Sequence, residues 1–185
     1  MFDKQSFIEQ CRAAIRDSDP QGAVRELVAK AVRDPADVVR VLGEPRRSGV
    51  ETLYRANDLT ILNLCWGPRM VFKPHDHRIW AVIGIYGGRE DNTFYRRSKD
   101  GLTRHGTKEL NAKETIPLGA AIIHAVTNPL DQITAAIHVY GGDFFATPRS
   151  EWDPQTFAEK PYDVEHTMRA FEEANERLRA LAPGS

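Results

Sequence analysis

Cysteine is scarce in this sequence, since only Cys11 and Cys65 occur among 185 residues. Cys11 lies in a helical pattern and Cys65 in a strand-like run, so a disulfide framework is not expected. No run approaches the ~20 apolar residues that a membrane span needs, and no N-terminal segment joins a basic start to an apolar core. We therefore expect a protein of the reducing cytoplasm that does not bind membranes.

An excess of charge of either sign is also absent. The 25 Lys and Arg residues nearly balance the 26 Asp and Glu residues, which leaves a net charge of −1. This balance argues against a nucleic-acid partner, and the N-terminal 43 residues lack a basic recognition helix. Hydrophobic residues at 41% indicate an ordinary globular core, and the length fits one domain over residues 1–185. We expect a monomer or a homodimer.

Helical patterns occupy both ends of the chain. Residues 2–17 and 21–32 carry apolar side chains near the i, i+3, i+4 spacing, and a third short helix is expected from Asp34 to Gly43. The sequence therefore predicts a helical segment over residues 1–43 that covers one edge or face of the β region after it. A C-terminal helical segment over residues 146–185 is expected to contain an amphipathic helix.

Short β-like runs fill residues 49–145, with turn residues between them. The expected strands are Val50–Arg55, Leu59–Trp66, Met70–Lys73, Trp80–Tyr86, Asn92–Arg97, Thr115–Val126 and Ile133–Tyr140. The polar segment from Ser98 to Gly106 is expected to be a loop. No long helices alternate with these strands, which argues against a parallel α/β sheet. The pattern predicts a mainly β fold, either a sandwich or a small barrel.

A histidine pair opens one of these strands. His75 and His77 stand one residue apart and lead into an apolar, β-branched run. Because side chains alternate along a strand, both imidazoles are expected on one face, where they offer two ligands to a metal ion. The alternative is a pair of solvated histidines on an exposed edge.

A third histidine occurs in a related context. His124 follows a Pro-x-Gly turn at residues 117–119 and a hydrophobic strand. Together with His75-x-His77, this stretch resembles the two motifs of the cupins, whose fold is an antiparallel jelly-roll barrel, or double-stranded β-helix. The resemblance implies that the three histidines converge on one metal ion. The glutamate that usually follows the first cupin histidine pair is missing, because residues 79–83 contain no carboxylate.

The missing carboxylate has a chemical consequence. Three neutral imidazoles leave the charge of a divalent metal uncompensated, so an anionic substrate can bind to it directly. Three ligands on one face of an octahedral iron also leave positions open for substrate and dioxygen. Three histidines equally suit zinc and the activation of water. We expect iron(II), with zinc, nickel or manganese as alternatives.

The carboxylate-free site resembles that of the thiol dioxygenases, the family of cysteine dioxygenase and 3-mercaptopropionate dioxygenase. The strand of residues 62–67 is similar to the family's strand before its metal motif. The resemblance implies that Arg55 binds the substrate carboxylate. It also implies that Tyr140, in a His-x-Tyr pattern with His138, directs its hydroxyl toward the metal. The similarity covers residues 54–140.

Two positions depart from the family's pattern. The serine of its Ser-x-His-x-Tyr triad is Ala136 here, so His138 lacks a hydroxyl partner. Val82 stands near the place of the cysteine that animal enzymes cross-link to the tyrosine, so no cross-link can form. Arg149 lies in a loop-like stretch that we place near the barrel mouth without assigning it a role.

The leading hypothesis is an oxidoreductase, an iron(II) dioxygenase that uses O2 to oxidise the thiol of a small carboxylate-bearing molecule to a sulfinate. Its substrate is of the cysteine or 3-mercaptopropionate type. One alternative keeps the metal but changes the reaction to carbon–carbon cleavage, isomerisation or hydrolysis. Another is a non-catalytic cupin that binds a small acid. Oxygen consumption separates an oxygenase from an isomerase, a hydrolase or a binding protein.

Overall fold

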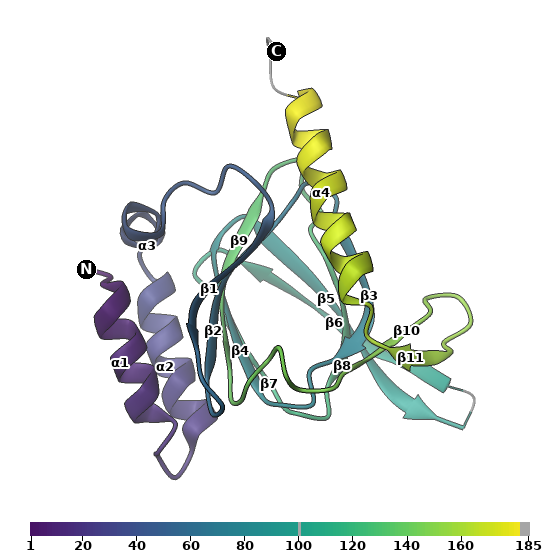
Figure 1. Ribbon diagram of the computed structural model, residues 1–185, viewed down its shortest axis with the longest axis horizontal. Helices are drawn as coiled ribbons and strands as arrows, with labels where there is room; N and C mark the ends of the chain where they lie inside the picture. Colours follow the sequence, from purple (N-terminus) through teal and green to yellow (C-terminus); the bar gives the residue numbers. More distant parts are fainter. Residues whose placement is uncertain (100, 182–185) are drawn as a thin grey trace.

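The computed structural model describes residues 1–99 and 101–181, whose strands form two antiparallel sheets with helices outside them (Figure 1). The five-stranded sheet has the spatial order β1 (Gly49–Arg55), β2 (Thr60–Trp66), β9 (Thr134–Tyr140), β4 (Ala81–Gly87), β7 (Thr115–Leu118). The six-stranded sheet has the order β11 (Glu159–Pro161), β10 (Ser150–Trp152), β3 (Val71–Asp76), β8 (Ile123–Thr127), β5 (Arg89–Ser98), β6 (Gly101–Asn111).

The order of the strands is that of a jelly roll. From β2 to β9 the chain passes repeatedly from one sheet to the other, which gives the orders β2-β9-β4-β7 and β3-β8-β5-β6. Apolar side chains of both sheets, such as Leu64 of β2 and Val126 of β8, pack together between them. In the described part of the chain the sheets do not join into one closed hydrogen-bonded barrel. The predicted fold class, a mainly β jelly roll with helices at both ends, is confirmed.

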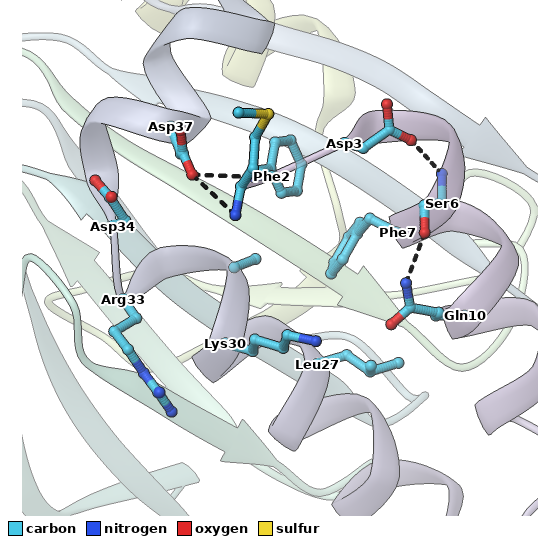
Figure 2. Close-up of a pocket in the computed structure, with 12 residues that line it drawn as sticks. Phe2, Asp3, Ser6, Phe7, Gln10, Leu27, Lys30, Arg33, Asp34 and Asp37 are labelled. Atoms are coloured by element: carbon cyan, nitrogen blue, oxygen red, sulfur yellow. Dashed lines mark hydrogen bonds and ion pairs between the residues drawn. The ribbon is translucent and has the colours of Figure 1, made fainter.

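Three helices precede the strands: α1 (Lys4–Ala14), α2 (Pro20–Val32) and α3 (Pro35–Leu42). The side chain of Asp3 accepts a hydrogen bond from the amide of Ser6 at 2.7 Å and begins α1. Asp19 begins α2 by the same type of contact, and Pro20 occupies the first turn. Asp37 of α3 accepts a hydrogen bond from the amide of Phe2 at 3.2 Å (Figure 2).

These helices cover the outer face of the five-stranded sheet, as the sequence predicts. Val28 of α2 packs over Gly84 of β4 so closely that a Cβ at Gly84 would lie 2.4 Å from its Cγ1 atom. Gln21 donates hydrogen bonds to the carbonyl oxygens of Ala81 and Leu118, at 3.0 and 2.9 Å. Glycine at position 84 therefore sets how near the helix approaches the sheet.

The C-terminal helix α4 (Val164–Leu181) lies on the other side of the molecule, where it contacts both sheets (Figure 1). It begins at Asp163, which accepts a hydrogen bond from the amide of His166 at 2.8 Å. Phe171 stacks on Trp66 of β2, with ring centroids 5.8 Å apart. Among the described helices, none combines the length and the apolar character that a membrane span requires.

The structure corrects three predictions about the strands. The expected loop from Ser98 to Gly106 is wrong, because β5 continues through Ser98 and β6 begins at Gly101. Most β6 side chains are exposed, so no apolar alternation marks the strand. The stretch 115–126 is divided into β7 and β8, which belong to different sheets. Two short strands, β10 and β11, lie in the C-terminal segment for which the sequence predicts helix.

Candidate metal centre

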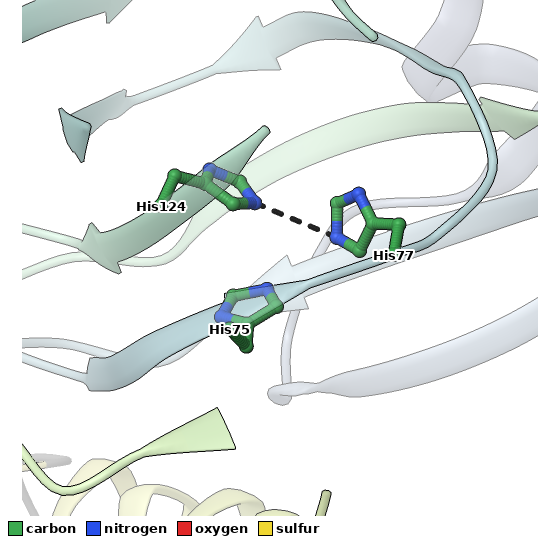
Figure 3. A group of neighbouring side chains, drawn as sticks. All are labelled: His75, His77 and His124. Atoms are coloured by element: carbon green, nitrogen blue, oxygen red, sulfur yellow. Dashed lines mark hydrogen bonds between the residues drawn. The ribbon is translucent and has the colours of Figure 1, made fainter. Parts of the chain in front are cut away.

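Three buried histidines meet between the sheets (Figure 3). His75 of β3 lies directly opposite His124 of β8 in the antiparallel ladder, and His77 follows the end of β3. The ladder is irregular between Phe72 and His75, at Pro74, which has no amide hydrogen to donate. One ligand atom from each histidine lies within 4.8 Å of the others. The predicted convergence of the three histidines is therefore present.

Hydrogen bonds set the orientation of two of these rings. Nδ1 of His75 lies 2.8 Å from the carbonyl oxygen of Lys73, and Nδ1 of His124 lies 2.7 Å from the side-chain oxygen of Asn92. Both acceptors require a proton on Nδ1, so each Nε2 keeps its lone pair. Nε2 of His124 lies 3.5 Å from Nε2 of His77. The lone pairs are therefore available to a metal ion.

A buried chain of hydrogen bonds supports His124 from behind. Asn92 donates from its amide nitrogen to one oxygen of Glu90 at 2.8 Å, which leaves its oxygen to accept from the histidine. The other oxygen of Glu90 accepts from the indole of Trp66 at 2.8 Å. Burial raises the pKa of Glu90, and both hydrogen bonds act against this rise. The site thus has a carboxylate behind its ligands rather than among them.

Burial keeps the three imidazoles neutral. It lowers the pKa of His75 to about 4, although the hydrogen bond to Lys73 acts in the opposite direction. Burial lowers the pKa of His77 and of His124 well below the usual histidine value, and the neighbouring histidines lower it further. A neutral imidazole is the form that binds metals.

The donor set fits a divalent metal ion. Three nitrogens at about 2.1 Å from one ion lie roughly 3.0–3.4 Å apart, and the measured separation of 3.5 Å between His77 and His124 is close to this. The three histidines would hold the ion on one side and leave the cavity side open. Imidazole ligands suit iron, zinc, nickel and copper, so the ligands alone do not select the metal.

A cavity of about 220 Å³ opens in front of the three histidines. Its walls between the sheets are apolar and aromatic, and include Leu64, Trp66, Phe72 and Val126. The segment after β9 and the chain before α4 add Phe144, Phe145, Arg149 and Tyr162. The first turns of α4 complete it with Val164, Thr167, Met168 and Phe171. The cavity therefore brings segments from most of the chain to the histidines.

The predicted catalytic pair lies in this cavity. Nδ1 of His138 lies 3.0 Å from the hydroxyl of Tyr140, and the Tyr140 ring centroid lies 5.2 Å from that of His77. Burial lowers the pKa of His138 to about 3 and raises the pKa of Tyr140. Nε2 of His138 has no hydrogen-bond partner among the described residues. Ala136, on the same face of β9, offers no side-chain hydroxyl for it.

Arg55 lies outside this cavity. Its guanidinium forms a two-point ion pair with Asp143, at 3.0 and 3.1 Å from Nε and 3.0 Å from Nη2, and half of its side chain is exposed. Its predicted contact with a substrate carboxylate stays a prediction. The arginine that lines the cavity is Arg149.

Arg149 is held in place by aromatic rings. Its guanidinium carbon lies 3.8 Å from the ring centroid of Phe144 and 4.4 Å from that of Tyr162. No carboxylate of the described residues forms an ion pair with it, and burial lowers its pKa. Its charge also contributes to lowering the pKa of His75 and His77, after the larger effect of burial. A cation with no acidic partner beside three neutral histidines is suited to bind an anion.

Three residues of this arrangement were not assigned by sequence: Glu90, Asn92 and Arg149. The first two point inward with Phe94 because they alternate along β5, and this alternation was the available signal. Arg149 follows β9 in an irregular segment, where no periodicity indicates the direction of a side chain.

No protein-family model matches the sequence. Solved structures of similar fold include an RmlC-like cupin family protein with a double-stranded β-helix fold from Methanocaldococcus jannaschii. It is 11% identical over 56% of this chain and 87% of that chain, with a TM-score of 0.46. An uncharacterised double-stranded β-helix protein from Klebsiella pneumoniae is 12% identical over 63% and 85% of the chains, with a TM-score of 0.39. Oxalate oxidase in complex with glycolate is 13% identical over 75% and 73%, with a TM-score of 0.43. These similarities assign no activity to this chain.

Proposed function

We propose that this protein is a non-haem iron(II) dioxygenase that oxidises the thiol of a small carboxylate to a sulfinate. The observation that carries the proposal is one cavity with three neutral histidines, no carboxylate among the candidate ligands, and Arg149 without an ion-pair partner among the described residues. In this reaction both atoms of O2 end on the sulfur, which loses four electrons. The thiol proton is released, and no further reductant is needed.

Different side chains bind the metal and the substrate. His75, His77 and His124 would hold the iron, which supplies the oxygen chemistry when it is bound. Arg149 binds the substrate carboxylate with its planar guanidinium, which Phe144 and Tyr162 keep in position. Binding of the carboxylate at Arg149 positions the thiol end of the substrate relative to the three histidines.

Tyr140 and His138 provide a hydrogen-bond donor to the reaction. The hydroxyl of Tyr140 is held by Nδ1 of His138, and both side chains face the cavity. Since burial raises the pKa of Tyr140, the hydroxyl keeps its proton and donates a hydrogen bond to negative charge that develops near His77. The apolar walls exclude water, which strengthens both this contact and that of Arg149.

The test is oxygen uptake by anaerobically purified, iron(II)-reconstituted protein with cysteine, cysteamine and 3-mercaptopropionate. Bound metal is quantified on the same sample, and sulfinate is measured by mass spectrometry. We expect one O2 consumed for each sulfinate formed, and no uptake by the His75→Ala variant. Full iron occupancy without uptake for any of the thiols would reject the proposal.

A second candidate is a metal-dependent reaction on a non-thiol substrate. Nε2 of His138 has no partner among the described residues, and Ala136 stands at the family's serine position. The hydrogen bonding around Tyr140 therefore differs from the family's pattern, which favours this candidate. Three histidines with an open position also suit zinc and water activation. Hydrolysis or isomerisation would turn over in the zinc-loaded protein without O2, which separates the two candidates.

A further inference from the structure

The cavity offers no counter-charge to a cationic group. None of the described residues that line it is an Asp or a Glu, and its one Lys or Arg side chain is Arg149. The buried carboxylate behind the site, Glu90, has both oxygens occupied by Trp66 and Asn92. A ligand ammonium group in this cavity would lose its water without gaining a carboxylate, which is unfavourable. The walls therefore favour an anion that carries no amino group.

The mouth of the cavity exposes apolar side chains. The described residues include seven exposed large apolar side chains, and four of them line this one cavity: Val50, Phe145, Val164 and Met168. The last three are 44%, 56% and 50% exposed: Phe145 lies in the segment after β9, and Val164 and Met168 lie in the first turns of α4. Exposed apolar side chains gathered around a cavity indicate an apolar ligand group at that place. We call Phe145, Val164 and Met168 the apolar rim.

The volume of the cavity indicates how large a ligand it holds. Its volume of about 220 Å³ equals that of roughly seven water molecules at ~30 Å³ each. A mercapto-carboxylate head of six non-hydrogen atoms occupies only part of this volume beside the histidines, and the apolar rim borders the part that a further group would occupy. We propose that the substrate is an ammonium-free mercapto-carboxylate with an alkyl or aryl group that lies along Phe145, Val164 and Met168. The thiol rests on the proposed function, whereas the apolar group and the missing ammonium rest on the cavity walls.

Binding is tested separately from turnover, by anaerobic calorimetric titration of the iron(II)-loaded protein. The probes are the straight-chain carboxylates from propanoate to octanoate, none of which contains a thiol. We expect the dissociation constant to fall about fourfold for each added methylene, since burying one contributes that factor. We expect 2-aminohexanoate to bind at least tenfold more weakly than hexanoate.

Matched variants locate the apolar group. Met168→Glu places a charge in the apolar rim at a half-exposed position, where the fold tolerates it. It is expected to remove the gain in affinity from the longer chains, so that the dissociation constant no longer falls from propanoate to octanoate. Ile122→Glu is the control, because Ile122 is also exposed but does not line this cavity. It is expected to leave the whole series unchanged.

Three results would overturn the proposal: equal affinity along the series, 2-aminohexanoate binding as tightly as hexanoate, or equal effects of the two variants. If Met168→Glu changed the oligomeric state by light scattering but not the chain-length dependence, the apolar rim would bind a second copy and the proposal would be wrong. Chain-length-dependent binding without oxygen uptake from any thiol would reject the dioxygenase and keep the ligand class. Uptake with binding independent of chain length would do the reverse.

Discussion

The side-chain oxygen of Asn92 lies 2.7 Å from Nδ1 of His124, and this contact directs the other nitrogen of the imidazole toward His77. Asn92 acts as the acceptor in this contact, because its oxygen faces the imidazole while its amide nitrogen donates to Glu90. The tautomer of one candidate metal ligand is thereby set by a residue 32 positions away in the sequence. Contacts of this kind behind metal ligands contribute to affinity as well as to orientation.

Replacing Asn92 by alanine is expected to weaken metal binding about 10- to 100-fold, since the His124 ring loses its orienting partner. The free energy of unfolding of the metal-free protein is expected to fall by about 1–3 kcal/mol, because buried groups of His124 and Glu90 lose a hydrogen bond. Metal affinity is measured by competition with a chelator and stability by urea denaturation. Asn57→Ala, at an exposed loop position, is the control. Unchanged metal affinity in Asn92→Ala would show that the contact is only structural.

Removing one histidine is expected to abolish metal loading. His124→Ala leaves two imidazoles, so the purified, iron(II)-incubated variant should contain no stoichiometric metal by mass spectrometry. Metal should also raise the melting temperature of the wild type and not that of the variant, because a ligand that binds only the native state stabilises it. His105→Ala, on the exposed part of β6, should behave as the wild type. Full loading of His124→Ala would place the metal elsewhere.

The two arginines are distinguished by substrate affinity. Arg149→Ala is expected to raise KM for a carboxylate substrate about 10- to 100-fold, because a charged hydrogen bond contributes about 1.5–3 kcal/mol. Arg55→Ala should change KM less than twofold, since its exposed ion pair with Asp143 lies outside the cavity. Steady-state oxygen uptake measures both. The opposite pattern would restore the role that sequence resemblance implies for Arg55.

Tyr140→Phe is expected to lower kcat about 100-fold, which is the usual cost of losing one hydrogen-bond donor to developing charge. Metal content and the melting shift on metal binding should stay as in the wild type, because Tyr140 is not one of the three candidate ligands. Tyr95→Phe is the matched control, since Tyr95 does not line the cavity. An unchanged kcat in Tyr140→Phe would assign the ring of Tyr140 to packing alone.

The approach of α2 to the sheet predicts a stability effect far from the metal. Gly84→Ala should lower the free energy of unfolding by about 1–3 kcal/mol, because the new Cβ would lie 2.4 Å from a methyl group of Val28. At Gly106 of β6 a Cβ meets nothing within 4 Å, so Gly106→Ala should change it by less than about 0.5 kcal/mol. Urea denaturation of the two variants tests whether the helices are packed as described.

Local patterns in the sequence determined the regular elements and the ligand set. The helical patterns at both ends of the chain became helices, and Asp19 and Asp163 cap two of them, α2 and α4. The apolar runs around the histidines became β3, β4, β8 and β9, because alternation along a strand is a property of neighbouring residues. His75, His77 and His124 were identified from the resemblance to the two cupin motifs. The histidine pair was expected to open a strand, whereas His75 lies near the end of β3 and His77 follows it. Strand β6 was not predicted, because most side chains of this edge strand are exposed and form no apolar face.

The tertiary structure decided what surrounds the histidines. The jelly-roll order brings β5 beside β8, so Asn92 and Glu90 support His124 from a distant part of the chain. Arg149 lines the cavity, and the two rings that hold its guanidinium, Phe144 and Tyr162, come from the segment after β9 and the chain before α4. Contacts between strands and irregular segments depend on long-range pairing. No local period in the sequence encodes that pairing, so alternation along β5 could indicate that Glu90 and Asn92 point inward but not that they support His124.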